Sequence, residues 1–277
     1  MLNQFFDHIY VLTLERAHHR RNHIESELKG LSFEFFTGVD KHQLDRDTLI
    51  DKGVYDDQRH RSCKRTHRGM NLGEIACALS HRNIWQDAVD KGYESILILE
   101  DDIHLERSRL ASFGRALEEL PNQWELLMLG YYSEKYPSFK THFQRATYQL
   151  YHQLKWFNWH KVSKGFIDNL LMQPFSDHLY RIGKLVGGHA YALRLETCRK
   201  FVAYQTPVFL QADRIYNYYL SDQGLNAFAL KDKLFTLAET ANDSMIGYAS
   251  FGEKLIERPM EWCRKVPSVV QRKSSKV

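Results

Sequence analysis

The stretch Ser95-Ile96-Leu97-Ile98-Leu99-Glu100-Asp101-Asp102 decides the fold, because an uninterrupted apolar run leads directly into three carboxylates. An apolar run without polar alternation is typical of a strand covered on both faces in an α/β sheet. Such sheets bind ligands beyond the carboxyl ends of their strands. Side chains alternate along an extended backbone, so we expect Glu100 and Asp102 on one side of the strand and Asp101 on the other.

Two converging carboxylates predict a site for a divalent cation. Crowded carboxylates repel each other, and burying them is costly unless a cation or hydrogen bonds compensate the charge. Mg²⁺ and Mn²⁺ prefer oxygen ligands, and Mg²⁺ typically combines one or two carboxylates with waters and the phosphate oxygens of a substrate. A second interpretation is open at this point, in which the acids cap the next helix or face solvent.

The rest of the chain alternates strand-like and helix-like segments, which predicts an α/β fold with a mostly parallel central sheet flanked by helices. Strands are expected at residues 9–14, 33–36, 96–99, 126–130, 187–193 and 226–230, and helices near 20–28 and at 73–91, 108–120 and 196–204. Residues 41–71 are rich in Asp, Arg and His, and we expect a solvated loop with one short helix there.

Residues 131–184 change character, with many aromatic side chains set among His and Lys. Three interpretations are open for this mainly helical insertion: a lid that binds an acceptor, an ordinary helical hairpin, or an aromatic and basic surface that rests on a membrane. Residues 251–277 form a basic tail, which is a second candidate for a peripheral membrane contact.

Composition narrows the class of protein. The 277 residues are 43% hydrophobic, which is enough for a globular core, and the net charge of +4 is too small to indicate a nucleic-acid partner. The four cysteines have no metal-binding or disulfide spacing, which favours a reducing compartment. We find neither a signal region nor 18 consecutive apolar residues, so we expect a cytoplasmic protein, at most peripheral on the inner face of the inner membrane.

A series of motifs in fixed order carries a family resemblance. The motifs are the turn Gly38-Val39-Asp40, the helical Cys77-Ala78-Leu79-Ser80-His81 with Trp85, the acidic Leu99-Glu100-Asp101-Asp102, the strand motif Gly188-His189-Ala190-Tyr191, and Asp213. Over residues 7–246 the chain resembles glycosyltransferase family 25, the lipopolysaccharide and lipooligosaccharide galactosyl- or glucosyltransferases related to collagen galactosyltransferases. It departs from the family pattern at Thr13, where the family has asparagine, and across residues 131–184.

The resemblance implies a GT-A type nucleotide-sugar-binding fold over residues 1–250 and a UDP-galactose or UDP-glucose donor. It also implies inversion at the anomeric carbon and a bacterial role in lipopolysaccharide, lipooligosaccharide or other surface-glycan synthesis, with an oligosaccharide or lipid-linked glycan as acceptor. In this interpretation Asp102 and Glu100 hold Mn²⁺ or Mg²⁺, and Asp213 is the catalytic base, with His189 and Asp222 as rivals.

The remaining roles that the resemblance implies concern the two sugars and the nucleotide. The expected donor-binding residues are Thr13, Arg16, Arg20, Ser80, His81, Glu100 and Asp101. Residues Gly188, His189 and Tyr191 are expected beside the donor or acceptor sugar.

Two competing interpretations remain. A sugar nucleotidyltransferase also needs clustered acids and a parallel sheet, but we find no glycine-rich phosphate loop after the first strand. A catalytically silent relative that binds a glycan or a partner enzyme is the second alternative. Metal-dependent hydrolysis of a nucleotide sugar separates these, because a binding protein releases no UDP.

Overall fold

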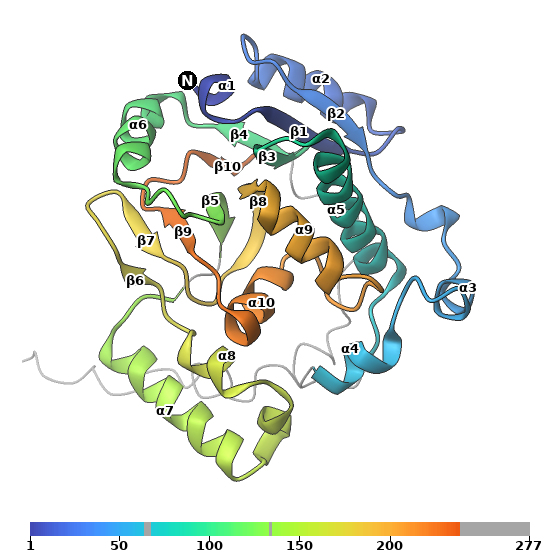
Figure 1. Cartoon of the computed structure of the whole chain (residues 1–277), viewed down its shortest axis with the longest axis vertical. Coiled ribbons are helices and arrows are strands. Elements are labelled where there is room, and N and C mark those ends of the chain that lie inside the picture. Colours follow the sequence, from blue (N-terminus) through green and yellow to red (C-terminus); the bar gives the residue numbers. More distant parts are fainter. Residues whose placement is uncertain (64–67, 133–134, 239–277) are drawn as a thin grey trace, which may run out of the picture. The chain divides into compact units, whose positions relative to one another are not determined.

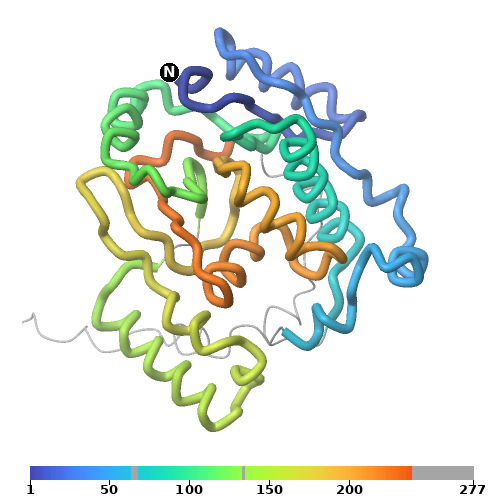
Figure 2. The backbone as a smooth tube through the Cα atoms, in the orientation of Figure 1, coloured from blue at the N-terminus to red at the C-terminus, as the bar shows by residue number. Residues whose placement is uncertain are grey.

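The computed structural model describes residues 1–63, 68–132 and 135–238, shown in Figures 1 and 2. Contacts divide the chain into one unit over Met1–Ile246 and a second over Gly247–Val277. The second unit, and with it the basic tail expected at residues 251–277, lies outside the described residues.

The centre of the first unit is an eight-stranded sheet. In spatial order its strands are β2 (Glu34–Thr37), β1 (His8–Thr13), β3 (Ser95–Glu100), β8 (Val186–Arg194), β5 (Leu126–Tyr132), β9 (Ala227–Leu230), β7 (Leu179–Arg181) and β6 (Gln173–Pro174). The pairings make β8 antiparallel to β3 and β5, and β7 antiparallel to β9 and β6. The other six strands share one direction, so the predicted α/β class with a mostly parallel sheet is confirmed.

Helices cover both faces of this sheet (Figure 1). One face packs against α5 (Leu72–Lys91), α9 (Leu195–Tyr204) and α10 (Ile215–Gln223), and the other against α1 (Leu2–Phe5), α2 (His18–Glu27) and α6 (Leu110–Glu119). Along β3, the side chains of Ile96 and Ile98 pack in the core under α5, α9 and α10. Those of Leu97 and Leu99 pack in the core on the opposite face, under α1, α2 and α6. The apolar run of β3 is therefore buried on both sides, as its sequence predicts.

Local signals at its two ends fix the long helix α5. Asn71 accepts a hydrogen bond from the Glu74 backbone N–H, and the Glu74 side chain accepts one from the Asn71 N–H, which completes a capping box. Gly92 ends the helix in the left-handed region, with φ of 71°, where glycine is least strained. The helix is thus held in a fixed register beside β3.

The described residues of the polar segment, 41–63 and 68–71, contain more regular structure than the sequence predicts. It forms the 3₁₀ turn η1 (Lys41–Gln43) and two short helices, α3 (Arg46–Asp51) and α4 (Asp57–Cys63). Asp40 and Asp45 cap the first two of these elements by accepting backbone hydrogen bonds. The prediction of a solvated loop with one short helix is wrong here. These short elements are stabilised by side-chain caps and have no periodic apolar pattern that the sequence could reveal.

Residues 131–184 divide between helices and strands. Tyr131 and Tyr132 belong to β5, followed by α7 (Phe139–Gln153), η3 (Trp156–Lys161) and α8 (Lys164–Asp168). The segment then returns to the sheet as the edge strand β6 and as β7, which lies between β6 and β9, and the sequence predicted neither strand. Figure 2 traces α7, η3 and α8 as a folded-back helical segment. No helix within residues 1–63, 68–132 and 135–238 has the length and apolarity needed to cross a bilayer.

Candidate active site

The three carboxylates after β3 meet a buried arginine from α2. Arg20 Nη1 lies 2.7 Å from Asp101 Oδ1 and 3.4 Å from Asp102 Oδ2. The Thr13 hydroxyl donates to the other oxygen of Asp101 at 2.7 Å. The strict alternation expected of these acids does not continue past Glu100, because the strand ends there and the next two residues form a turn. Asp101 and Asp102 consequently share one guanidinium.

Strand pairing explains why these groups meet. Strands β1 and β3 are parallel with Leu12 opposite Glu100, so Thr13 reaches the same edge of the sheet as Asp101. Helix α2 starts shortly after β1, which brings Arg20 back over that edge. The sequence predicts Arg20 as a donor-binding residue, but its buried guanidinium is engaged by carboxylates. In this structure, Arg20 acts as their counter-ion.

Negative charge at this edge exceeds what Arg20 compensates. Burial, followed by the charges of Asp102, Asp101 and Asp213, raises the pKa of Glu100 to about 8. Burial also raises the pKa of Asp102, although Arg20 opposes that shift. Among the described residues, Asp102 Oδ1 is buried and has no hydrogen-bond partner. A further cation is therefore favoured beside Asp102.

The donor set fits a divalent metal that shares its ligands with a substrate. No group of three or more His, Cys, Asp or Glu side chains in the part of the chain that the structure describes could hold a metal by itself. Mg²⁺ commonly takes only one or two carboxylates, with waters and phosphate oxygens completing its shell. The free oxygen of Asp102 and the carboxylate of Glu100 can supply such a pair.

Asp213 faces the same site from the segment that leads into α10. The Gly187 N–H donates to Asp213 Oδ2 at 3.4 Å, and Arg214 Nε lies 3.8 Å from the other carboxylate oxygen. The charge of Asp213 contributes to the raised pKa values of Glu100 and Tyr216, so these groups are electrostatically coupled. The charge of Asp213 therefore acts on Glu100, the acid that ends β3.

The two rival bases are placed less favourably. Asp222 accepts an exposed hydrogen bond from the Tyr204 hydroxyl at 2.9 Å. His189 Nε2 lies 3.2 Å from the Phe235 carbonyl oxygen and must donate to it, because a carbonyl only accepts. Burial lowers the pKa of His189 to about 4, and its Nδ1 has no partner among the described residues.

His81 and Tyr191 form a buried relay behind Glu100. The Trp85 indole N–H donates to the Tyr191 hydroxyl oxygen at 3.0 Å, and that hydroxyl lies 2.8 Å from His81 Nδ1. Donation from Tyr191 to His81 satisfies all three groups and leaves the imidazole proton on Nε2, 3.8 Å from Glu100 Oε1. Burial lowers the pKa of His81 to about 4, so the ring is neutral. Tyr191 was expected beside a sugar, but its hydroxyl is occupied here.

Ser80 and Arg16 both hold the turn after β2. Ser80 Oγ donates to the Ala76 carbonyl at 2.7 Å and accepts from the Val39 N–H at 2.8 Å. Arg16 Nε donates to Asp40 Oδ2 at 2.7 Å, with half of its side chain exposed. The geometry gives these two predicted donor-binding residues contacts within the protein that fix residues 38–40.

The glycine pair at the start of β8 permits close packing around Asp213. A Cβ atom at Gly188 would lie 2.5 Å from the Tyr216 hydroxyl, and one at Gly187 would lie 2.2 Å from the Tyr132 ring. Tyr132 stacks on His189, with ring centroids 6.3 Å apart. Tyr132 and Tyr216 are site residues that the sequence did not identify. The Gly187-Gly188 pair was the available signal, since it marks a close approach by other groups.

A polar network links the segment that carries Asp213 to the start of α5. Glu74 accepts two hydrogen bonds from Arg68, at 2.7 and 2.8 Å, and one from Gln211 Nε2 at 3.1 Å. Gln211 precedes Asp213 by two residues. The buried His60 supports the same segment, because its Nδ1 lies 2.6 Å from the Phe209 carbonyl oxygen.

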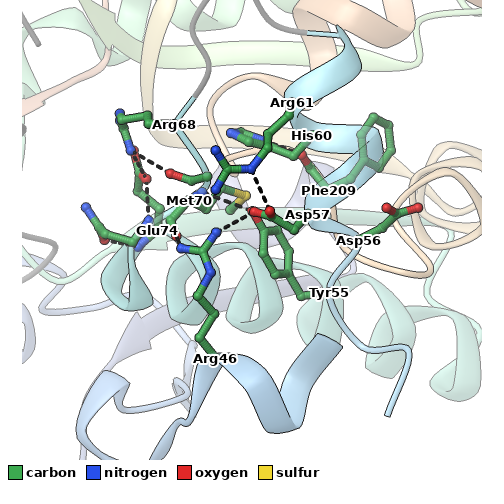
Figure 3. Close-up of polar contacts among 12 residues, drawn as sticks. Arg46, Tyr55, Asp56, Asp57, His60, Arg61, Arg68, Met70, Glu74 and Phe209 are labelled. Atoms are coloured by element: carbon green, nitrogen blue, oxygen red, sulfur yellow. Dashed lines mark hydrogen bonds and ion pairs between the residues drawn. The ribbon is translucent and has the colours of Figure 1, made fainter. Parts of the chain in front are cut away.

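The same region contains a second set of ion pairs around Asp57 (Figure 3). Asp57 accepts hydrogen bonds from Arg46, from Arg61 at 2.6 Å and from the Tyr55 hydroxyl at 2.8 Å. Arg46 also donates to the Met70 carbonyl at 2.6 Å. Helices α3 and α4 are thereby joined to the chain that enters α5.

Comparison with known families identifies this arrangement. The family model described as Glycosyltransferase family 25 (LPS biosynthesis protein) matches residues 6–216. The chain belongs to glycosyltransferase family 25. The matched region includes the acids after β3, the relay behind Glu100 and Asp213, so the family resemblance drawn from the sequence is confirmed.

Curated relatives share one part of the family 25 chain. A protein from Aedes aegypti named Glycosyltransferase 25 family member is 38% identical over 132 residues, 44% of this chain and 21% of that protein. Procollagen galactosyltransferase 1 of Danio rerio is 29% identical over 135 residues, 45% of this chain and 21% of that protein. A rat protein named Probable inactive glycosyltransferase 25 family member 3 is 30% identical over 135 residues, 45% of this chain and 23% of that protein. The matched segments span about a fifth of these relatives.

Proposed function

We propose that this family 25 chain is an inverting, metal-dependent hexosyltransferase that moves a sugar from a UDP-sugar to a glycan hydroxyl. The observation that carries the proposal is the buried Asp102 oxygen that has no partner among the described residues, close to a Glu100 whose pKa is raised in part by the charge of Asp213. Galactose is the favoured hexose, because a relative at 29% identity is named a procollagen galactosyltransferase.

Glu100 and Asp102 are the residues that would hold Mn²⁺ or Mg²⁺. The bound metal would supply positive charge that stabilises the diphosphate as it leaves. Arg20 keeps Asp101 and Asp102 in place through its ion pairs. The neutral His81 positions Glu100 from behind rather than adding a charge to the site.

Asp213 would act as the general base. Its carboxylate takes the proton from the acceptor hydroxyl while the hydroxyl oxygen forms a bond to C1 of the hexose. The bond from C1 to the diphosphate oxygen breaks, and UDP leaves with the electron pair. Attack on the face opposite the leaving group inverts the anomeric carbon. Gly187 orients Asp213 by donating its backbone N–H.

The biological setting is a further part of the proposal. We place the chain in surface-glycan synthesis, of lipopolysaccharide or lipooligosaccharide, because the matching family is described as an LPS biosynthesis protein. Bacterial origin and a cytoplasmic location stay predictions from the sequence.

A silent relative is the second candidate, because one similar protein is named probably inactive. The test is UDP release from a panel of UDP-sugars by the purified chain, with Mn²⁺ and with a chelator. We expect release from one hexose donor that stops when the metal is removed. Folded protein that binds UDP but releases none from any donor, with or without glycan acceptors, would support the silent candidate.

A further inference from the structure

Helix α7 presents an apolar stripe to solvent. Phe139 and Phe143 are 90% and 68% exposed, and Leu150 is also exposed. Their spacing of four and seven residues places them on one face of the helix. The exposed Leu154 and Trp156 continue the apolar surface beyond the end of α7. We call Phe139, Phe143, Leu150, Leu154 and Trp156 the α7 stripe. Contiguous exposed apolar surface of this kind marks a site of interaction.

The other side of α7 is anchored to the protein. Tyr148 stacks on Trp159 with ring centroids 4.0 Å apart, and both join a core with Phe166 of α8. Gln149 Nε2 donates to Asp168 Oδ1 at 2.8 Å. Because these contacts hold the helix from one side, the α7 stripe faces outward from a fixed helix.

The charge of the residues around the α7 stripe indicates what kind of surface it binds. Residues 135–167 contain six Lys and Arg residues and neither Asp nor Glu. Lys140 follows Phe139 on α7, Lys164 begins α8, and both are exposed. A helix with exposed aromatic residues and flanking cations is typical of one that lies in a membrane interface. Basic residues are attracted to leaflets that contain anionic lipids.

We propose that α7 and the following turn rest on an anionic phospholipid surface. Phe139, Phe143 and Leu150 insert among the headgroups, while Lys140 and Lys164 lie near lipid phosphates. Charge disfavours two other occupants. A second copy would bring equal positive charges together. Residues 251–277 carry seven Lys and Arg against three Glu, so their net charge has the same sign as that of residues 135–167. This inference does not depend on the proposed catalytic role.

The test is co-sedimentation of the full chain with phosphatidylcholine vesicles, with and without phosphatidylglycerol. We expect binding to the anionic vesicles that weakens as salt is raised. The double variant F139S/F143S should lower the partition coefficient by about tenfold or more, because each phenylalanine loses buried apolar area. I50S, which removes an exposed apolar residue from α3, is the matched control and should bind like the original chain.

Charge-reversal variants test the same surface with little risk to folding. K140E/K164E should weaken binding to anionic vesicles, whereas K29E/K52E, an equal charge change on exposed residues outside the insertion, should weaken it less. Equal binding by the original chain, F139S/F143S and K140E/K164E would overturn the proposal. So would equal binding to neutral and anionic vesicles, or a dimer in solution that F139S/F143S dissociates.

Discussion

Arg20 and Asp101 form a buried ion pair, with Nη1 2.7 Å from Oδ1 and side chains only 9% and 7% exposed. The pair joins helix α2 to the end of β3, and the same guanidinium reaches Asp102. Removing one partner from a buried pair leaves the other charge without compensation, which is more harmful than losing an exposed pair. Arg20 is therefore a structural requirement of the acidic site.

Arg20→Met should destabilise the fold by about 3–5 kcal/mol, because Asp101 and Asp102 then stay buried without their counter-ion. Urea unfolding at neutral pH measures this. Arg16→Met is the matched control: it removes a more exposed pair with Asp40 and should change the free energy of unfolding by about 1 kcal/mol or less. Equal losses in the two variants would contradict the assignment of Arg20.

Neutralising Asp102 and neutralising Asp101 should have different effects on the melting temperature. Without metal, Asp102→Asn should leave the melting temperature unchanged or higher, since burial and nearby acids already disfavour the charged form of Asp102. Asp101→Asn should lower it, because a charge-assisted bond to Arg20 is worth about 1.5–3 kcal/mol. Thermal unfolding of both variants in a chelator tests this. A lower melting temperature for Asp102→Asn than for Asp101→Asn would refute it.

Glu74 should make the free energy of unfolding depend on pH. Burial opposes ionisation, but hydrogen bonds from Arg68, Asn71 and Gln211 together lower the pKa of Glu74 from 4.5 to about 2. A pKa depressed by folding adds stability above pH 4.5 and loses it as the pH falls toward 2. The free-energy difference between the original chain and Glu74→Gln should therefore approach about 3 kcal/mol at neutral pH and shrink in acid.

Denaturant unfolding at several pH values measures the Glu74 effect. Glu118→Gln, a change of an exposed residue on α6, serves as the control. A difference between Glu74→Gln and the original chain that stays constant from pH 7 to pH 3 would show that the carboxylate charge is not responsible.

Tyr191→Phe should destabilise the protein by about 1–3 kcal/mol, since the Trp85 indole N–H and His81 Nδ1 lose their shared buried partner. Tyr204→Phe loses a solvent-exposed hydrogen bond to Asp222 and should have a smaller effect. Chemical unfolding compares the two variants. If Tyr191→Phe were the milder change, the proposed relay would be wrong.

Much of the fold follows from local pattern. The apolar run before Glu100 and the capped helix α5 were predicted to within about a residue, because burial on both faces and a 3.6-residue period leave clear signatures. Strands β4 (Ile103–Leu105) and β10 (Phe235–Leu237) were missed. Each has three residues and, within the part of the chain that the structure describes, pairs only with the other strand, far along the chain, so neither carries a local signal. Helix α10 was missed because Ile215 to Tyr218 are buried consecutively, without helical alternation.

Less of the site could be predicted. The sequence identified Glu100, Asp102 and Asp213 as acids of one site, and the structure brings them together. It also predicted Arg20 as a donor-binding residue, because a guanidinium matches phosphate geometry. The carboxylate that Arg20 contacts, Asp101, is 81 positions away and becomes adjacent only through the pairing of β1 with β3. His60 was expected in solvent for the same reason, since its partner Phe209 is distant in sequence.

The central claim is that Asp102 serves the metal and the diphosphate whereas Asp213 serves the acceptor. Calorimetric titration of UDP in the presence and absence of Mn²⁺, on the original chain, Asp102→Asn and Asp213→Asn, tests it most directly. We predict that Mn²⁺ tightens UDP binding to the original chain and to Asp213→Asn, and has no such effect on Asp102→Asn. Undiminished metal-dependent binding in Asp102→Asn, or its loss in Asp213→Asn, would contradict the account.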